Sequence, residues 1–138
     1  MRIVLDTSVL VAAHIARAGV CAQLVEMILD DPRHSIHGSE FILQEFDRTL
    51  ARKLKFDPEL SRQAMERWRA CVSIVAPMEV PPQRCRDPED LEILGTAAAA
   101  KADLLISVDK DLLVLGSFRQ IRIIKPGEAF SLIRQPTQ

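Results

Sequence analysis

The chain has 138 residues, of which 48% are hydrophobic and 27% charged, and its net charge is −1 at pH 7. This composition excludes a disordered chain, and the near-neutral charge provides no overall attraction for nucleic acid, so such binding must come from local basic patches. No apolar run approaches the roughly 20 residues of a membrane helix, and no signal peptide precedes the first predicted strand. We therefore expect a cytoplasmic protein with no membrane partner, folded as a single domain over residues 1–138.

Short apolar runs alternate along the chain with segments of helical periodicity. Ser39, Asp57 and Asp87 are typical helix N-caps, and the last two are followed by proline. In chain order we expect a strand at 2–6, helices at 8–16 and 21–29, a strand at 34–37, helices at 39–53 and 57–70, a strand at 72–75, a loop at 77–86, a helix at 87–101, a strand at 104–109, a short helix at 110–115, a strand at 121–124 and a helix from 126.

This alternation predicts an α/β fold with three α/β/α layers, in which helices cover both faces of a central parallel sheet of about five strands. The three cysteines are odd in number and lack C-x-x-C spacing, which argues against a disulfide framework or a zinc ribbon.

Two of the predicted strands end in an aspartate. Asp6 follows the apolar residues 3–5, and Asp109 follows the largely apolar run 104–108. In open α/β sheets, ligands bind at the carboxyl ends of strands where the strand order reverses. Two close carboxylates repel each other by roughly 4 kcal/mol at an effective dielectric near 20, and a divalent cation offsets this repulsion. The two aspartates therefore predict a site for a hard cation, Mg²⁺ or Mn²⁺ rather than zinc.

Further acids lie on predicted helices. Glu45 is at the edge of a buried stripe, where a purely structural role would favour an aliphatic side chain, and Asp90 is in a first turn, where the helix dipole stabilises a negative charge by about 0.3–1 kcal/mol. Each is open to two interpretations, a metal ligand or an ordinary helix residue. Asp87 is explained by N-capping, worth about 1 kcal/mol, but remains a substitute ligand. Asp111 either shares the role of Asp109 or begins the next helix.

In this ordered set of segments the chain resembles the PIN-domain ribonucleases, including the toxins of bacterial toxin–antitoxin pairs. The matching segments are 4–10, 39–50 with Glu45, 86–90, 102–113, 118–119 and 124–126. The resemblance implies a PIN-like sheet, one or two Mg²⁺ or Mn²⁺ ions, cleavage of RNA, a homodimer and a cognate antitoxin partner. It assigns the catalytic and metal-binding acids to Asp6, Glu45, Asp90 and Asp109, and it gives Ser8 the task of orienting Asp6 or a metal-bound water.

The mechanism that follows is attack on the RNA phosphorus by a metal-activated water, which leaves 5′-phosphate and 3′-hydroxyl ends. Because phosphates approach an acidic site, nearby cations must guide them. The candidates for this RNA-binding role are Arg48, Arg52, Lys53 and Lys110, with Lys55, Arg84 and Arg86 as further cations. With one Trp and no Tyr, the chain lacks a series of aromatic side chains for stacking bases.

Three other classes of protein share parts of this pattern. A catalytically silent PIN-like module that binds RNA or protein is the closest, since Leu91 stands where relatives often have Asn beside the acid. A phosphorylated receiver domain would need an aspartate at the end of the strand at 72–75, which has none. A dinucleotide-binding enzyme would need a glycine-rich turn after the first strand, and residues 6–8 contain no glycine.

Overall fold

The computed structural model describes residues 1–53, 55 and 57–135. In chain order its elements are β1 Arg2–Leu5, α1 Thr7–Ile15, α2 Val20–Asp30, β2 Ser35–Gly38, α3 Glu40–Arg52, α4 Pro58–Cys71, β3 Val72–Ile74, a 3₁₀ turn Pro82–Arg84, α5 Pro88–Ala99, β4 Leu104–Ile106, α6 Lys110–Leu113, β5 Ser117–Phe118, β6 Ile121–Ile124 and α7 Pro126–Arg134.

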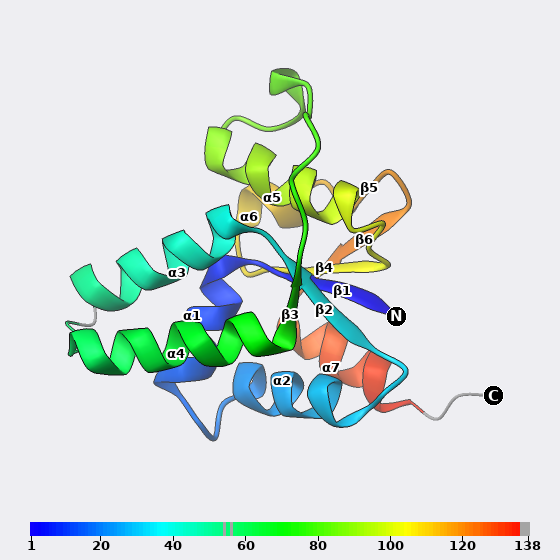
Figure 1. The fold of residues 1–138 in the computed structure, drawn as a ribbon. Coiled ribbons are helices and arrows are strands. Elements are labelled where there is room, and N and C mark those ends of the chain that lie inside the picture. Colours follow the sequence, from blue (N-terminus) through cyan, green and yellow to red (C-terminus); the bar gives the residue numbers. More distant parts are fainter. Residues whose placement is uncertain (54, 56, 136–138) are drawn as a thin grey trace.

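The strands form one sheet in the order β3-β2-β1-β4-β6-β5. The first five strands in this order are parallel, and β5 runs antiparallel to β6. α2 and α7 pack together below the sheet, whereas α5 and α6 lie above it (Figure 1). The predicted α/β sheet between helical layers is therefore confirmed. The order reverses at β1, whose neighbours are β2 and β4, so β1 and β4 border the place where ligands bind in such sheets.

One strand was not predicted. β5 pairs with β6 through the residues Phe118 and Ile121, and the two residues between them, Arg119 and Gln120, have φ angles of 49° and 68°. Two consecutive positive φ angles are typical of a type I′ hairpin turn, which usually carries Asn-Gly or Asp-Gly. Because Arg-Gln lacks that signature, the sequence predicted about five strands instead of six.

The core of the sheet is apolar on both faces. Ile3, Val4 and Leu5 of β1 and all three residues of β4 are fully or almost fully buried. Strands covered by helices on both sides require such continuous apolar runs. The caps are also as predicted, since the Asp57 carboxylate accepts from Glu59 N–H at 2.8 Å and Ser39 Oγ accepts from Ile42 N–H at 3.4 Å. Because β1 and β4 are buried side by side, the residues that follow them lie at the same edge of the sheet.

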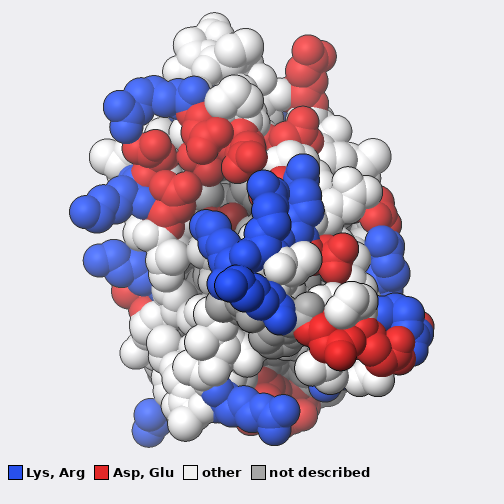
Figure 2. All heavy atoms as spheres, turned by 90° about the vertical axis from the view of Figure 1, so that its left-hand side faces the viewer, with Lys and Arg blue, Asp and Glu red and all other residues white. Residues whose placement is uncertain are grey.

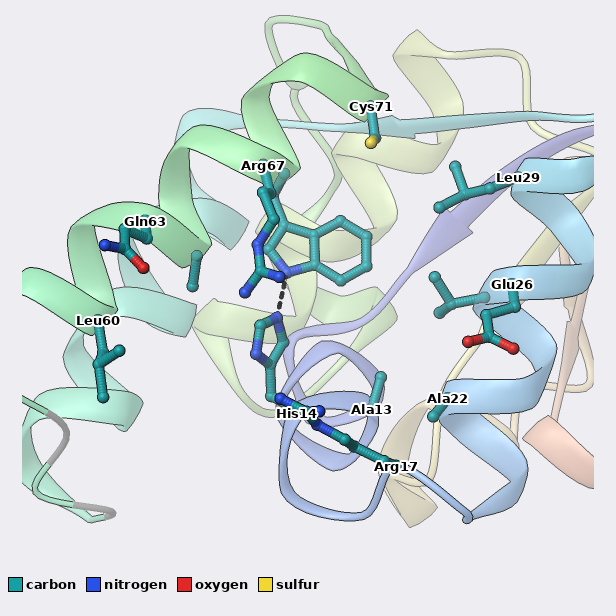
Figure 3. A pocket seen from close by; sticks show the side chains of 13 residues that line it. Ala13, His14, Arg17, Ala22, Glu26, Leu29, Leu60, Gln63, Arg67 and Cys71 are labelled. Atoms are coloured by element: carbon teal, nitrogen blue, oxygen red, sulfur yellow. Dashed lines mark hydrogen bonds between the residues drawn. The ribbon is translucent and has the colours of Figure 1, made fainter.

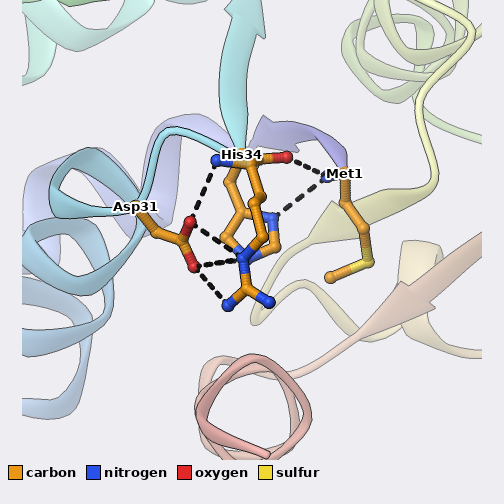
Figure 4. A network of polar contacts seen from close by, with 4 residues as sticks. Met1, Asp31 and His34 are labelled. Atoms are coloured by element: carbon orange, nitrogen blue, oxygen red, sulfur yellow. Dashed lines mark hydrogen bonds and ion pairs between the residues drawn. The ribbon is translucent and has the colours of Figure 1, made fainter. Parts of the chain in front are cut away.

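The amino end of β1 is held by a polar network (Figure 4). The Met1 α-amino group donates to the Arg33 carbonyl at 2.7 Å and lies 3.0 Å from His34 Nδ1. The Arg33 guanidinium in turn pairs with Asp31 at 2.7 Å. These contacts tie the amino end of β1 to the turn before β2, and Asp6 directly follows the carboxyl end of the same strand.

Among the described residues, no single helix is long and apolar enough to cross a membrane. α1 and α2 meet that criterion only when taken as a pair, and the pair is bent by 104°.

Candidate functional site

Asp6 and Asp109 emerge at the same edge of the sheet, as expected. β1 and β4 pair in parallel with Leu5 opposite Ile106, and Asp6 N–H continues the ladder to the Ile106 carbonyl at 3.0 Å. Asp6 then caps α1, and Asp109 caps α6. The carboxyl ends of the two strands therefore deliver both aspartates to one place.

A buried hydroxyl that the sequence reasoning missed links the two aspartates. Ser107 Oγ donates to Asp6 Oδ2 at 2.7 Å and accepts from Asp109 N–H at 2.9 Å. Asp6 also accepts from Thr7 N–H at 2.7 Å and from Ser8 Oγ at 3.2 Å, the contact that the prediction for Ser8 requires. The only sequence signal for this role of Ser107 was a hydroxyl group within the largely apolar predicted strand at 104–109.

Asp6 is a buried carboxylate, with 7% of its surface exposed. Burial raises its pKa above the ordinary value for aspartate, although its hydrogen bonds from Ser107, Ser8 and Thr7 oppose the shift, and the charge of Asp109 raises it further. The hydrogen bonds hold Asp6 in one orientation, while burial makes its negative charge costly in the absence of a cation.

Asp90 is buried to a similar degree, with 5% of its surface exposed, in the first turn of α5. Burial and then the negative charge of Asp109 raise the pKa of Asp90 to about 7. Cys85 Sγ donates to Asp90 Oδ2 at 3.6 Å and opposes this shift. No sequence motif indicated that Cys85 would lie beside the acids. Perturbed carboxylates of this kind gather at functional sites.

Three carboxylates approach one another most closely. Oxygen atoms of Asp90, Asp109 and Asp111 all lie within 4.8 Å of one another. Asp111 N–H also donates to Asp109 Oδ1 at 2.9 Å, and the Asp111 carboxylate pairs with Arg86 at 2.9 Å. Asp111 therefore lies beside Asp109 in the first turn of α6, and a shared role with Asp109 stays a prediction.

The four acids assigned by the family resemblance line one cavity of about 560 Å³. Glu45 reaches it from α3, at the edge of the helix's buried face as predicted, and it pairs with Arg48. Asp87, which caps α5 by accepting from Glu89 N–H at 2.9 Å, also lines the cavity. The full lining is Asp6, Thr7, Ser8, Val11, Ala12, Ile15, Phe41, Glu45, Thr49, Lys53, Asp87, Glu89, Asp90, Ile93, Val108 and Asp109.

The four predicted RNA-binding cations differ in their relation to this cavity. Lys53 is part of the lining, whereas Arg48, Arg52 and Lys110 are exposed residues outside it. Figure 2 shows acidic side chains gathered in the upper part of one face and a group of Lys and Arg side chains directly below them. Groups of opposite charge are therefore neighbours on this face of the molecule.

The donor set suits a hard divalent cation. Oxygens on opposite sides of an octahedral Mg²⁺ lie roughly 4 Å apart, so carboxylates within 4.8 Å of one another need only small side-chain movements to share one ion. Burial is the main reason that the pKa values of Asp6 and Asp90 are raised, and the negative charge of Asp109 adds to both shifts, so a bound cation would stabilise the charged form of these acids. The residues present therefore fit a cation of the Mg²⁺ or Mn²⁺ type.

A second cavity, of about 590 Å³, lies between α1, α2 and α4 and has different chemistry (Figure 3). Trp68 Nε1–H donates to His14 Nε2 at 2.9 Å at its base, and burial lowers the pKa of His14. Its lining includes Arg17 and Arg67 but only one acid, Glu26. Despite its size, this cavity offers no cluster of ligands for a hard cation.

Comparisons with known proteins identify the fold. Residues 2–111 match the model of the PIN domain family. Two solved structures are similar: VapBC2 from Rickettsia felis bound to a DNA fragment from its promoter, with TM-score 0.63 and 15% identity over 91% of this chain and 98% of that chain, and VapBC-1 from nontypeable Haemophilus influenzae, with TM-score 0.64 and 19% identity over 92% and 99%. The comparison with curated proteins gives no match. The chain belongs to the PIN domain family, whose members are typically nucleases.

Proposed function

We propose that this protein is a metal-dependent endoribonuclease that cleaves single-stranded or structured RNA. The observation that carries the proposal is the convergence of Asp6, Glu45, Asp90 and Asp109 on one cavity at the carboxyl ends of β1 and β4. Membership of the PIN domain family supports the same chemistry. These four acids are the proposed catalytic and metal-binding residues, with Ser8, Asp87 and Asp111 in supporting roles.

Asp90 and Asp109 are the proposed principal ligands, because their oxygens already lie close together and the charge of one raises the pKa of the other. Asp6 and Glu45 face the same cavity from β1 and α3. When bound, Mg²⁺ or Mn²⁺ supplies Lewis acidity toward the scissile phosphate and lowers the pKa of the attacking water.

The protein's own groups prepare the site for that ion. Ser107 and Ser8 hold Asp6 Oδ2 in place by hydrogen bonds of 2.7 and 3.2 Å, so the carboxylate loses little entropy on binding. Asp90, with its pKa near 7, retains a proton on a fraction of molecules at neutral pH and gives it up when a cation binds. Arg86 neutralises Asp111 at the edge of the cluster.

The experiment is cleavage of end-labelled RNA with Mn²⁺, with Mg²⁺ and with chelator. We expect internal cuts that need the metal and leave 5′-phosphate and 3′-hydroxyl ends, because water is the proposed nucleophile. Products that end in 2′,3′-cyclic phosphate would contradict the mechanism, since they arise from attack by the ribose hydroxyl. Metal binding without cleavage of any RNA would instead favour the silent binding module.

We also propose that the nuclease is the toxin of a toxin–antitoxin pair. The support is that the similar solved chains belong to VapBC assemblies. The proposal predicts that expression of this chain alone arrests growth and that the Asp6→Asn variant does not. Growth arrest by both proteins would show that the effect does not depend on the acidic site.

A further inference from the structure

The cavity that holds the acids extends away from them as a groove between two helices. On α1 its lining residues are Thr7, Ser8, Val11, Ala12 and Ile15, which recur at spacings of three and four residues and therefore share one face of the helix. On α3 they are Phe41, Glu45 and Thr49, with Lys53 following at the same spacing of four. α1 and α3 pack against each other along this line.

The groove changes in character along its length. Both helices begin at the carboxyl ends of strands, so Ser8 lies beside Asp6 at the acidic end. Ile15 lies seven residues further on, about 10 Å away at the helical rise of about 1.5 Å per residue. Ile15 lines the cavity and is 58% exposed, so a ligand in the groove can reach it. Lys53 lies at the corresponding end of α3 and is also exposed. The groove thus runs from carboxylates, along an aliphatic wall, to a cation.

We propose that this groove is the subsite for the nucleotide next to the scissile phosphate. Its unstacked base lies on the aliphatic stripe formed by Val11, Ala12 and Ile15, and its other phosphate pairs with Lys53. The inference rests on the proposed ribonuclease function and adds the part of the substrate that the enzyme recognises.

The order of chemical groups in the groove matches that of an RNA strand. A nucleotide presents a phosphate, an apolar base face and a second phosphate, and the groove presents a cation site, an aliphatic wall and an ammonium group. A base can lie on the wall only when it has left its stack, which costs a few kcal/mol in a duplex and little in a single strand. Val11, Ala12 and Ile15 offer no polar side chain to read base edges, so contact with this wall tolerates every base but requires it to be unpaired. The facing side of the groove, on α3, is polar at Glu45 and Thr49.

A second exposed apolar residue lies directly beside the acids. Val108 is 52% exposed, immediately precedes Asp109 and lines the same cavity. Val114 is 80% exposed and does not line it, which makes Val114 a matched control for changes at exposed aliphatic positions.

The test compares steady-state cleavage of a single-stranded RNA and the same RNA in a full duplex by wild type, Ile15→Ala, Ile15→Leu, Lys53→Ala and the controls Val114→Ala and Lys101→Ala. Lys101 is exposed just before the amino end of β4, on the edge of the sheet opposite the acids.

For Ile15→Ala we expect a 5- to 10-fold rise in KM for the single strand with kcat changed less than 2-fold, and for Ile15→Leu we expect KM to return toward the wild-type value. For Lys53→Ala we expect weaker binding and a salt slope reduced by about 0.7, the value for one lost phosphate contact. The two control variants should have the KM, kcat and salt slope of wild type.

The outcomes separate the two proposals. Wild-type cleavage with an unchanged KM in both Ile15→Ala and Lys53→Ala overturns the groove subsite while the ribonuclease assignment stands. Equal cleavage of single-stranded and duplex RNA by wild type also overturns it. Absence of wild-type cleavage across varied RNAs overturns the ribonuclease assignment and the subsite with it. Melting temperatures check that every variant is folded. We expect them all to fold, because the substituted residues are exposed.

Discussion

Asp6→Asn is expected to lower the rate of RNA cleavage about 100- to 1,000-fold, the usual cost of removing one electrostatic partner of a transition state. Asp6 lies in the cavity with one oxygen held by Thr7 N–H and the other by two hydroxyls. An amide of nearly the same shape keeps the packing but removes the negative charge that a cation needs. Because burial already raises the pKa of Asp6, loss of the charge should leave the stability of the fold within about 1 kcal/mol of wild type.

The assay needs a control for contaminating ribonuclease, which survives any substitution in this protein. Asp30→Asn is suitable, since Asp30 is exposed at the end of α2 and does not line the acidic cavity. Wild type and Asp30→Asn should cleave alike while Asp6→Asn does not. Equal activity in all three preparations would show that the observed cleavage comes from another enzyme.

Gly95→Ala is expected to destabilise the fold by at least about 3 kcal/mol, at the upper end for overpacked positions. Gly95 lies in α5, and a Cβ atom built there would come within 2.2 Å of the Met78 carbonyl oxygen. The backbone in this region has little freedom to move, because Met78 N–H donates to the Gly95 carbonyl at 3.0 Å. The clash outweighs the roughly 1 kcal/mol that alanine contributes to helix propensity.

Chemical denaturation of Gly95→Ala and Gly127→Ala side by side measures this effect. Gly127 is in α7, where a Cβ atom meets nothing within 4 Å, so its replacement should be neutral or stabilise by up to about 1 kcal/mol. A Gly95→Ala variant as stable as wild type would contradict the close approach of α5 to the segment that follows β3. Since α5 carries Asp90, such a result would also question the position of that acid.

Much of the fold follows from local signals in the sequence. Asp57 and Asp87, each followed by proline, fix the starts of α4 and α5, and the buried apolar runs identify β1 and β4. These signals are local, because capping and side-chain periodicity depend on neighbours a few residues away. β5 was missed because its hairpin turn at Arg119 and Gln120 uses residues without turn preference.

The site was only partly accessible from the sequence. Asp6 and Asp109 follow strands, so the topology of a parallel sheet alone brings them to one edge. Glu45 and Asp90 needed the family resemblance, since helix spacing could not distinguish ligands from ordinary helix residues. Ser107 and Cys85 were not foreseen, because their roles depend on contacts with Asp6 and Asp90 that no local pattern encodes.

In the proposed divalent-cation site, the bound ion relieves the repulsion among these carboxylates. Asp90 binds its proton more tightly in the folded state than in the unfolded chain, because its pKa rises from 3.8 to about 7. Its contribution to stability is therefore present at acidic pH and lost as the pH rises through about 7. At pH 8 without metal, Asp90→Asn should be more stable than wild type by roughly 1–2 kcal/mol, after allowance for solvent screening at the open cavity.

The measurement is the melting temperature of wild type, Asp90→Asn and Asp30→Asn at pH 8, with chelator and with excess Mn²⁺. We predict that Asp90→Asn melts about 3–8 °C above wild type in chelator. We also predict that Mn²⁺ at about 100 times its Kd stabilises wild type and Asp30→Asn by about 2.7 kcal/mol and Asp90→Asn far less. Equal Mn²⁺ shifts in all three proteins, or no shift in wild type, would contradict a cation site at these acids.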